Sequence, residues 1–217
     1  MAEQYFARKP KSARRPGAFH VEARGHAFTF LTDAGVFSRG GLDRGSEILL
    51  DALDVGPSEL ILDLGCGYGV LGVVASRLSK GGHVILTDVN ERAVALARKN
   101  LEANRVTNAE VRRGDLYESV SGMRFDHIVC NPPLRAGRPV VDRIIEEAPV
   151  HLLEGGRLWL VARTRQGADS LRNRMIKAFT SAVVVKRGSG YKVVCATKAA
   201  KETPSEEEIQ SRREDSS

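Results

Sequence analysis

Residues 59–69 read Glu-Leu-Ile-Leu-Asp-Leu-Gly-Cys-Gly-Tyr-Gly, and this stretch decides the fold. Its first half is apolar except for Asp63, as is typical of a strand that is buried on both faces. Glycine then recurs at alternate positions, where it lets the backbone turn sharply and approach a ligand closely. The three glycines are Gly65, Gly67 and Gly69. Because a helical stretch follows at residues 70–78, the segment predicts the strand, turn and helix that open a nucleotide-binding α/β fold.

Further strands are predicted on both sides of this unit, and helical stretches separate most of them. A β-hairpin closes the series, because a Gly-Ser-Gly turn joins its two strands. Such alternation predicts a doubly wound α/β fold with a seven-stranded, mainly parallel sheet and a C-terminal antiparallel hairpin. Its ligand site is expected at the carboxyl ends of the strands. The strands are expected at residues 60–64, 83–88, 109–115, 125–130, 157–162, 182–186 and 191–195.

The composition is that of an ordinary globular protein, with 217 residues, 42% of them hydrophobic and 28% charged. No apolar run approaches the roughly 18 residues that a membrane span needs, and the N-terminus lacks the apolar core of a signal peptide. We therefore expect a cytoplasmic protein. The three cysteines have no Cys-x-x-Cys spacing and the histidines no paired spacing, so neither a disulfide framework nor a metal site is expected.

The formal net charge is +6, and it is unevenly distributed along the chain. Residues 1–24 are polar and basic, and we expect a flexible arm there. Residues 25–198 are expected to form the folded domain, and residues 199–217, which are acidic and lack periodicity, a disordered polar tail. An excess of basic residues suits a polyanionic partner such as a nucleic acid. The alternative is a solvated basic surface.

Acidic residues lie at the carboxyl ends of three of the predicted strands. Asp63 with the glycine turn resembles motif I of class I S-adenosylmethionine (SAM) methyltransferases. This resemblance implies that Asp63 accepts from the ammonium of SAM, directly or through water. Asp88 can accept from both ribose hydroxyls, although it could equally cap the next helix. Asp115 can accept from the adenine amine while Leu116 packs near the ring, the alternative being an ordinary turn.

A fourth strand ends at Asn131-Pro132-Pro133-Leu134, which resembles motif IV of methyltransferases that act on exocyclic amines. An aromatic amine is a poor nucleophile because its lone pair is delocalised into the ring. The side-chain oxygen of Asn131 and the backbone carbonyl of Pro132 can accept its two N–H bonds, which favours a pyramidal nitrogen facing the methyl group. We therefore expect Asn131 and Pro132 to be catalytic, with Asn131 also near the cofactor. A proline-stiffened loop is the alternative.

Several neighbouring residues are candidates for contact with the substrate. Leu134 stands where the related motif usually has an aromatic residue, so the target base needs another stacking partner, and Phe37 is our candidate. Phe37 could instead anchor the core. Pro133 is expected to contact the substrate, and Arg135 and Arg138 could contact phosphates or be solvated. Cys130 lacks the preceding proline of cytosine-C5 chemistry and is expected to be a buried thiol.

The segment before the glycine turn gives a more specific resemblance. Residues 35–50 read Gly-Val-Phe-Ser-Arg-Gly-Gly-Leu-Asp-Arg-Gly-Ser-Glu-Ile-Leu-Leu, and they look like the corresponding segment of small-subunit ribosomal RNA guanine-N2 methyltransferases. Asn-Pro-Pro, Glu154-Gly155-Gly156 and residues 190–193 occur in the matching order, so the similarity covers residues 26–197. It implies SAM as methyl donor and a guanine N2 of 16S rRNA, naked or in the small ribosomal subunit, as acceptor. The chain resembles the short, single-domain members.

Two other functions fit the same residues. The first is methylation of a DNA adenine or a protein glutamine, since each presents a planar amine to the same acceptors. The second is a nucleic-acid-binding module that retains SAM without turnover. The intact Asn131 argues against the second, because a degenerate site has no need of that group.

Overall fold

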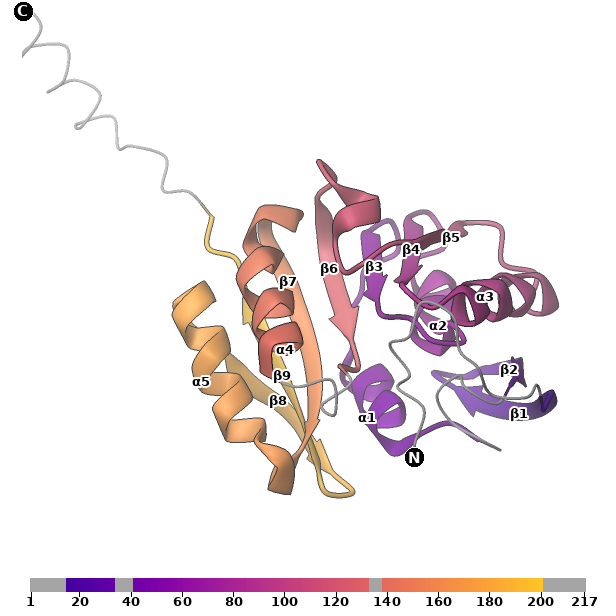
Figure 1. Cartoon of the computed structure of the whole chain (residues 1–217), viewed down its shortest axis with the longest axis horizontal. Helices are drawn as coiled ribbons and strands as arrows, with labels where there is room; N and C mark the ends of the chain where they lie inside the picture. Colours follow the sequence, from indigo (N-terminus) through magenta and orange to yellow (C-terminus); the bar gives the residue numbers. More distant parts are fainter. Residues whose placement is uncertain (1–14, 34–40, 133–137, 201–217) are drawn as a thin grey trace, which may run out of the picture.

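The computed structural model describes residues 15–33, 41–132 and 138–200, and a seven-stranded sheet forms its centre (Figure 1). Neighbouring strands are parallel from the β5 edge to β7, while β9 pairs antiparallel with both β7 and β8. The predicted fold is therefore confirmed. In spatial order the strands are β5 (Ala109–Arg113), β4 (His83–Asp88), β3 (Leu60–Leu64), β6 (Phe125–Cys130), β7 (Leu152–Arg163), β9 (Tyr191–Thr197) and β8 (Val183–Gly188).

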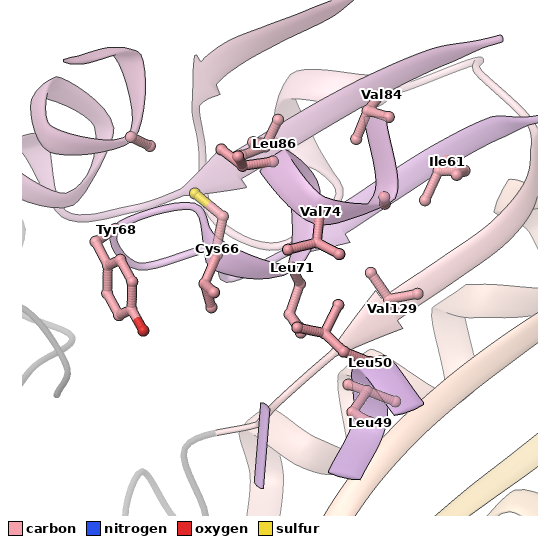
Figure 2. Packing of buried hydrophobic residues seen from close by; sticks show 14 of the residues in the cluster. Leu49, Leu50, Ile61, Cys66, Tyr68, Leu71, Val74, Val84, Leu86 and Val129 are labelled. Atoms are coloured by element: carbon pink, nitrogen blue, oxygen red, sulfur yellow. The ribbon is translucent and has the colours of Figure 1, made fainter. Parts of the chain in front are cut away.

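Helices cover both faces of the sheet because successive side chains of a strand point to opposite faces. Ile61 packs with α1, α2 and α3, whereas Leu62 belongs to the cluster under α4 and α5. Figure 2 shows the first of these layers, where Leu49 and Leu50 of α1 and Leu71 of α2 lie over the sheet. The helices are α1 (Arg44–Ala52), α2 (Val70–Leu78), α3 (Glu91–Ala103), α4 (Arg138–Glu147) and α5 (Ala168–Phe179), with short 3-10 helices at Glu118–Val120, Ala148–His151 and Thr164–Gln166 (η4).

The N-terminal segment contains a hairpin where the sequence had predicted an arm. Strand β1 (Gly17–Ala23) pairs antiparallel with β2 (His26–Thr32), so the prediction of a flexible arm is wrong for residues 17–23. Arg24 and Gly25 both have positive φ, 52° and 76°, as a two-residue hairpin turn requires. The rings of Phe19 and Phe30 lie 5.7 Å apart and both pack against Tyr68. Residues 1–14 and 201–217 lie outside the described residues.

Two asparagines of α3 attach this hairpin to the domain. The side chain of Asn104 accepts from the backbone N–H of Thr29 at 3.0 Å and donates to its carbonyl at 2.8 Å. Asn100 bonds both backbone groups of Leu31 in the same way and also donates to the carbonyl of Tyr68 at 2.7 Å. The two amides thus pair with the edge of β2 as a neighbouring strand would, and they join the hairpin to the glycine turn.

Capping residues and a proline set the ends of the helices. Asp43 caps α1, which ends at Ala52. Helix α4 ends at Glu147, because Pro149 has no N–H to continue the α-helical bonds and a 3-10 turn follows. The cap of α3 is Asn90, so Asp88 is not a helix cap.

Candidate active site

A cavity of about 370 Å³ opens at the carboxyl ends of β3, β4 and β6. Its wall contains all the predicted cofactor residues except Gly69, and it also contains Pro132. The topology explains this convergence, because parallel neighbours bring their carboxyl ends to one edge of the sheet. Other lining residues had not been predicted at the site, among them Ser46 of α1, Asn90, and Val140 and Ile144 of α4.

The glycine turn has the backbone conformation that its sequence implied. Gly65, Gly67 and Gly69 all have positive φ, of 72°, 58° and 90°. A Cβ on Gly69 would lie 3.1 Å from the side chains of Ala97 and Leu86, so this glycine allows α3 and the sheet to pack closely. Gly69 therefore acts in packing, whereas Gly65 and Gly67 line the cavity.

Asp88 holds the turn in place while facing the cavity. One carboxylate oxygen accepts from the N–H of Gly67 at 2.9 Å, and the other accepts from the N–H of Asn90 at 2.8 Å. Burial raises the pKa of Asp88, and its hydrogen bonds to backbone N–H groups oppose that shift. Each oxygen keeps further acceptor capacity, so the carboxylate can also accept from a ligand hydroxyl.

Asp63 is the most deeply buried of the three carboxylates, with 1% of its surface exposed. Its Oδ2 accepts from the N–H of Gly72 at 2.8 Å, in the first turn of α2. Its Oδ1 is buried without a hydrogen-bond partner among the described residues. Burial is the main reason that the pKa of Asp63 rises to about 7. An orphaned carboxylate oxygen in a cavity wall fits a cationic ligand group such as the ammonium of SAM.

Asp115 and Leu116 form the third wall, after β5. The Asp115 carboxylate receives a hydrogen bond of 3.1 Å from Arg143 of α4, so it is an ion-pair partner as well as a lining residue. Leu116 has φ of 48°, which is unusual for a residue with a branched side chain. A strained residue of this kind at a cavity wall is consistent with a binding role.

Asn131 follows β6 at the same edge, and α1 holds its side chain. The amide nitrogen donates to Oδ1 of Asp43 at 3.0 Å and to the hydroxyl of Ser46 at 3.1 Å. These two acceptors use both amide hydrogens, which leaves the side-chain oxygen of Asn131 as the acceptor for another molecule. Asp43, the N-cap of α1, and Ser46 both lie in the segment that resembles the rRNA enzymes.

Three of the remaining predicted site residues, Phe37, Pro133 and Arg135, lie outside the described residues, as does Leu134, which stands in place of the aromatic residue of the related motif. Arg138 is exposed at the first position of α4.

The cysteines, the possible metal ligands and the length of the helices bear on other kinds of site. Cys66 and Cys130 are buried, and burial raises the pKa of both thiols, so neither is an activated nucleophile. Within the three described ranges, no group of three or more His, Cys, Asp and Glu side chains is placed to hold a metal ion. In the same part of the chain, no helix is long and apolar enough to cross a membrane.

Known proteins share both the sequence and the architecture. A Bacillus subtilis protein called YbxB, described as uncharacterized, is 38% identical over 200 residues, which is 91% of this chain and all of that protein. The ribosomal RNA small subunit methyltransferase C of Hamiltonella defensa is 39% identical over 75% of this chain and 48% of its own length. The Thermus thermophilus 16S rRNA N2 G1207 methyltransferase (RsmC), solved with AdoMet and guanosine, superposes with a TM-score of 0.77 and 30% identity, covering 84% of this chain and 50% of that one.

These matches agree on the methyltransferase part of the molecule. The chain spans about half the length of the curated rRNA methyltransferases that it matches, and the whole length of the Bacillus protein. The family called methyltransferase small domain matches residues 27–195, which include the glycine turn, the cavity and Asn131. The chain belongs to the methyltransferase small domain family.

Proposed function

We propose that this protein transfers the methyl group of SAM to the exocyclic N2 amine of a guanine in 16S rRNA. The proposal draws its substrate from the names of the rRNA methyltransferases at 38–40% identity and of the guanosine-bound neighbour. The observation that carries it is the side chain of Asn131, whose two amide hydrogens are both engaged by α1 at the wall of the cavity.

The cofactor half of the cavity fits SAM. Asp63 offers an orphaned oxygen to the ammonium, Asp88 offers acceptors to the ribose, and Leu116 lies where an apolar ring needs a surface. SAM supplies a methyl group on a positively charged sulfur, and this group leaves without any covalent bond to the protein. The task of the protein is therefore to hold two reactants in line and keep them there.

The acceptor half fits an amine on an aromatic ring. The free Oδ1 of Asn131 and the backbone carbonyl of Pro132 can accept the two N–H bonds of the guanine amine. These bonds strengthen as the nitrogen becomes pyramidal, so they stabilise the transition state more than the bound substrate. Once methylated, the nitrogen carries a positive charge and releases one proton to solvent, because neither amide carbonyl is basic enough to keep it.

A basic surface lies beside this half and favours a nucleic acid as substrate. We call Arg138, Arg163, Arg165 and Arg187 the basic rim. All four are exposed, and none forms an ion pair with a carboxylate in the described part of the chain. Arg163 ends β7, Arg165 lies in η4, and Arg187 lies near the end of β8, so these three lie at the carboxyl edge of the sheet, on the β7 side of β6. Guanidinium groups of this kind suit phosphates, and a glutamine-bearing protein has no need of them.

Transfer of labelled methyl groups tests the proposal directly. The protein is incubated with tritium-labelled SAM and, in separate reactions, with small ribosomal subunits, naked rRNA, DNA and ribosomal protein, and the products are hydrolysed and separated. Label in N2-methylguanosine is the expected result. Label in N6-methyladenine or in glutamine would assign a different amine, and SAM binding without transfer to any of the four would indicate a module that does not turn over.

A further inference from the structure

Asp43 joins two parts of the molecule that are far apart in sequence. As the cap of α1, its Oδ1 accepts from the N–H groups of Gly45 at 3.0 Å and Ser46 at 3.1 Å. The same oxygen accepts from the amide nitrogen of Asn131, which is 88 residues away. The other oxygen of Asp43 is buried and has no hydrogen-bond partner among the described residues. One carboxylate oxygen therefore serves the helix cap and the catalytic loop together.

The chemistry of these groups fixes which way the Asn131 amide points. A carboxylate accepts hydrogen bonds and cannot donate them, so only the nitrogen end of an amide can face it. The reversed amide would place its oxygen against the Asp43 oxygen, with no hydrogen between them. The Ser46 hydroxyl takes the second hydrogen of the nitrogen, which secures the same orientation.

Gly45 lies next to the Asn131 amide, where a side chain would crowd it. A Cβ on this residue would lie 3.1 Å from the amide nitrogen of Asn131 and 3.3 Å from its oxygen. It would also lie 3.0 Å from the Asp43 oxygen. The bare backbone of α1 thus lets the Asn131 amide approach its two acceptors, and a side chain here would displace it.

We propose that Asp43 is a positioning residue that keeps the Oδ1 of Asn131 directed at the methyl-accepting amine. This inference rests on the proposed function, since it assumes that Asn131 accepts from the substrate. Asp43 acts through Asn131 and does not itself touch the substrate, and Ser46 supports it.

The first experiment compares Asp43→Ala with a change at the same end of α1. Asp43→Ala should lower kcat by about ten- to hundredfold, the scale of a misplaced reacting group, with little change in SAM affinity. Glu47→Ala is the matched control, because Glu47 pairs with Arg44 in the first turn of α1 and, among the described residues, forms no hydrogen bond with Asn131. Thermal unfolding of each variant measures the stability lost with the helix cap, so that a fall in kcat is not mistaken for partial unfolding. A folded Asp43→Ala enzyme with the wild-type kcat would mean that Asp43 only caps the helix.

The second experiment tests whether the effect passes through Asn131. In an Asn131→Ala background, adding Asp43→Ala should cause little further loss of kcat, because the group to be positioned is gone. Asn131→Asp places two carboxylates against each other and should lower activity. Adding Asp43→Asn should partly restore the activity, because the new amide can donate a hydrogen bond to the carboxylate introduced at position 131. The cap of α1 should survive, since asparagine also caps helices well. Additive losses, or a double variant no better than Asn131→Asp, would overturn the proposal.

A readout without substrate separates this inference from the proposed function. In the wild-type protein, the side-chain amide hydrogens of Asn131 should exchange slowly by NMR, and Asp43→Ala should accelerate the exchange. Rapid exchange in both proteins would refute the positioning role whatever the substrate is. Slow exchange that Asp43→Ala accelerates, together with full activity of Asn131→Ala, would instead refute the catalytic role proposed for Asn131.

Discussion

The two halves of the sheet's carboxyl edge carry opposite charges. The half that contains β3, β4 and β5 presents Asp63, Asp88 and Asp115 to the cavity, whereas the other half carries Arg163 and Arg187 on β7 and β8. Strand β6 lies between them in the sheet, and Asn131 follows it. In the function proposed above, the order of the strands therefore separates a cofactor side from a nucleic-acid side and puts the amide of Asn131 at their boundary.

The two halves also differ in burial. Asp63 is buried and receives a backbone N–H bond, and Asp88 receives two. The arginines of the basic rim are exposed and free of ion pairs within the described residues. Buried acceptors suit a small ligand of one shape, because their positions are fixed before it arrives. Exposed cations suit a long polyanion, and salt should weaken its binding far more than that of the cofactor.

The largest expected effect comes from changing Asn131, at the boundary between the two halves of the edge. Asn131→Ala removes the acceptor for the target amine, and loss of such a preorganised group costs about a hundredfold to a thousandfold in turnover. SAM affinity should hardly change, and RNA affinity should fall only slightly, because phosphate contacts supply most of it. Single-turnover rates with both ligands saturating measure the effect. Near-normal rates would mean that other groups orient the amine.

A change on the cofactor side should affect only the affinity for SAM. Asp88→Ala should lower the binding free energy of SAM by about 1–3 kcal/mol, the scale of hydrogen bonds to a charged group. Asp88→Asn is the matched variant, since it keeps one acceptor oxygen and should lose less. Calorimetry measures both affinities, and thermal unfolding checks that the loss of the Gly67 and Asn90 bonds has not unfolded the turn. Unchanged SAM affinity in the folded alanine variant would remove Asp88 from the site.

A change in the basic rim should affect only the affinity for RNA. Replacing Arg163, Arg165 and Arg187 together by glutamine should flatten the plot of log affinity against log salt by about two, at roughly 0.7 per phosphate contact with a single strand. At physiological salt this corresponds to a loss of RNA affinity of some tens of fold. SAM affinity should stay the same.

The control for the basic rim removes the same charge from the opposite edge of the sheet. Lys80, Arg105 and Arg124 are exposed just before β4, β5 and β6, at their amino ends. Replacing these three by glutamine should leave the salt slope close to that of the wild type. Equal slopes for the two triple variants would mean that RNA responds to net charge rather than to a surface beside Asn131.

The sequence allowed prediction of the parts of the site that follow from strand order. Asp63, Asp88, Asp115 and Asn131 each lie at or just after the carboxyl end of a predicted strand, and parallel topology brings such positions to one edge. The fold followed from the same periodicity. The expected contacts with cofactor and substrate stay predictions, and three of the residues expected to contact the substrate, Phe37, Pro133 and Arg135, lie outside the described residues.

What escaped prediction depends on contacts between distant residues. The bonds from Asn104 to Thr29 and from Asn131 to Asp43 span 75 and 88 positions, and no local pattern marks them. Strand β1 was missed for a different reason. Apolar Phe19 and Val21 do alternate with polar neighbours, but the basic residues before them dominated the interpretation of the whole segment.

The smallest expected effect concerns the pH dependence of the cofactor side. Burial raises the pKa of Asp63 to about 7, so at lower pH its carboxyl is protonated in the free protein. A cationic ammonium binds the ionised form, and binding below pH 7 must therefore first release this proton. SAM affinity should fall by roughly tenfold between pH 8 and pH 6 and level off above the pKa. Calorimetry across this range measures it.

Asp63→Asn and S-adenosylhomocysteine sharpen this last test. The asparagine keeps an acceptor for the Gly72 N–H but has no proton to release, so its affinity for SAM should be lower and nearly independent of pH. S-adenosylhomocysteine carries the same ammonium without the charged sulfur, and with wild-type protein it should show the same pH dependence as SAM. If only SAM showed it, Asp63 would be responding to the sulfonium. If Asp63→Asn kept the wild-type slope, another group would be titrating, and the orphaned oxygen of Asp63 would have no part in holding the cofactor.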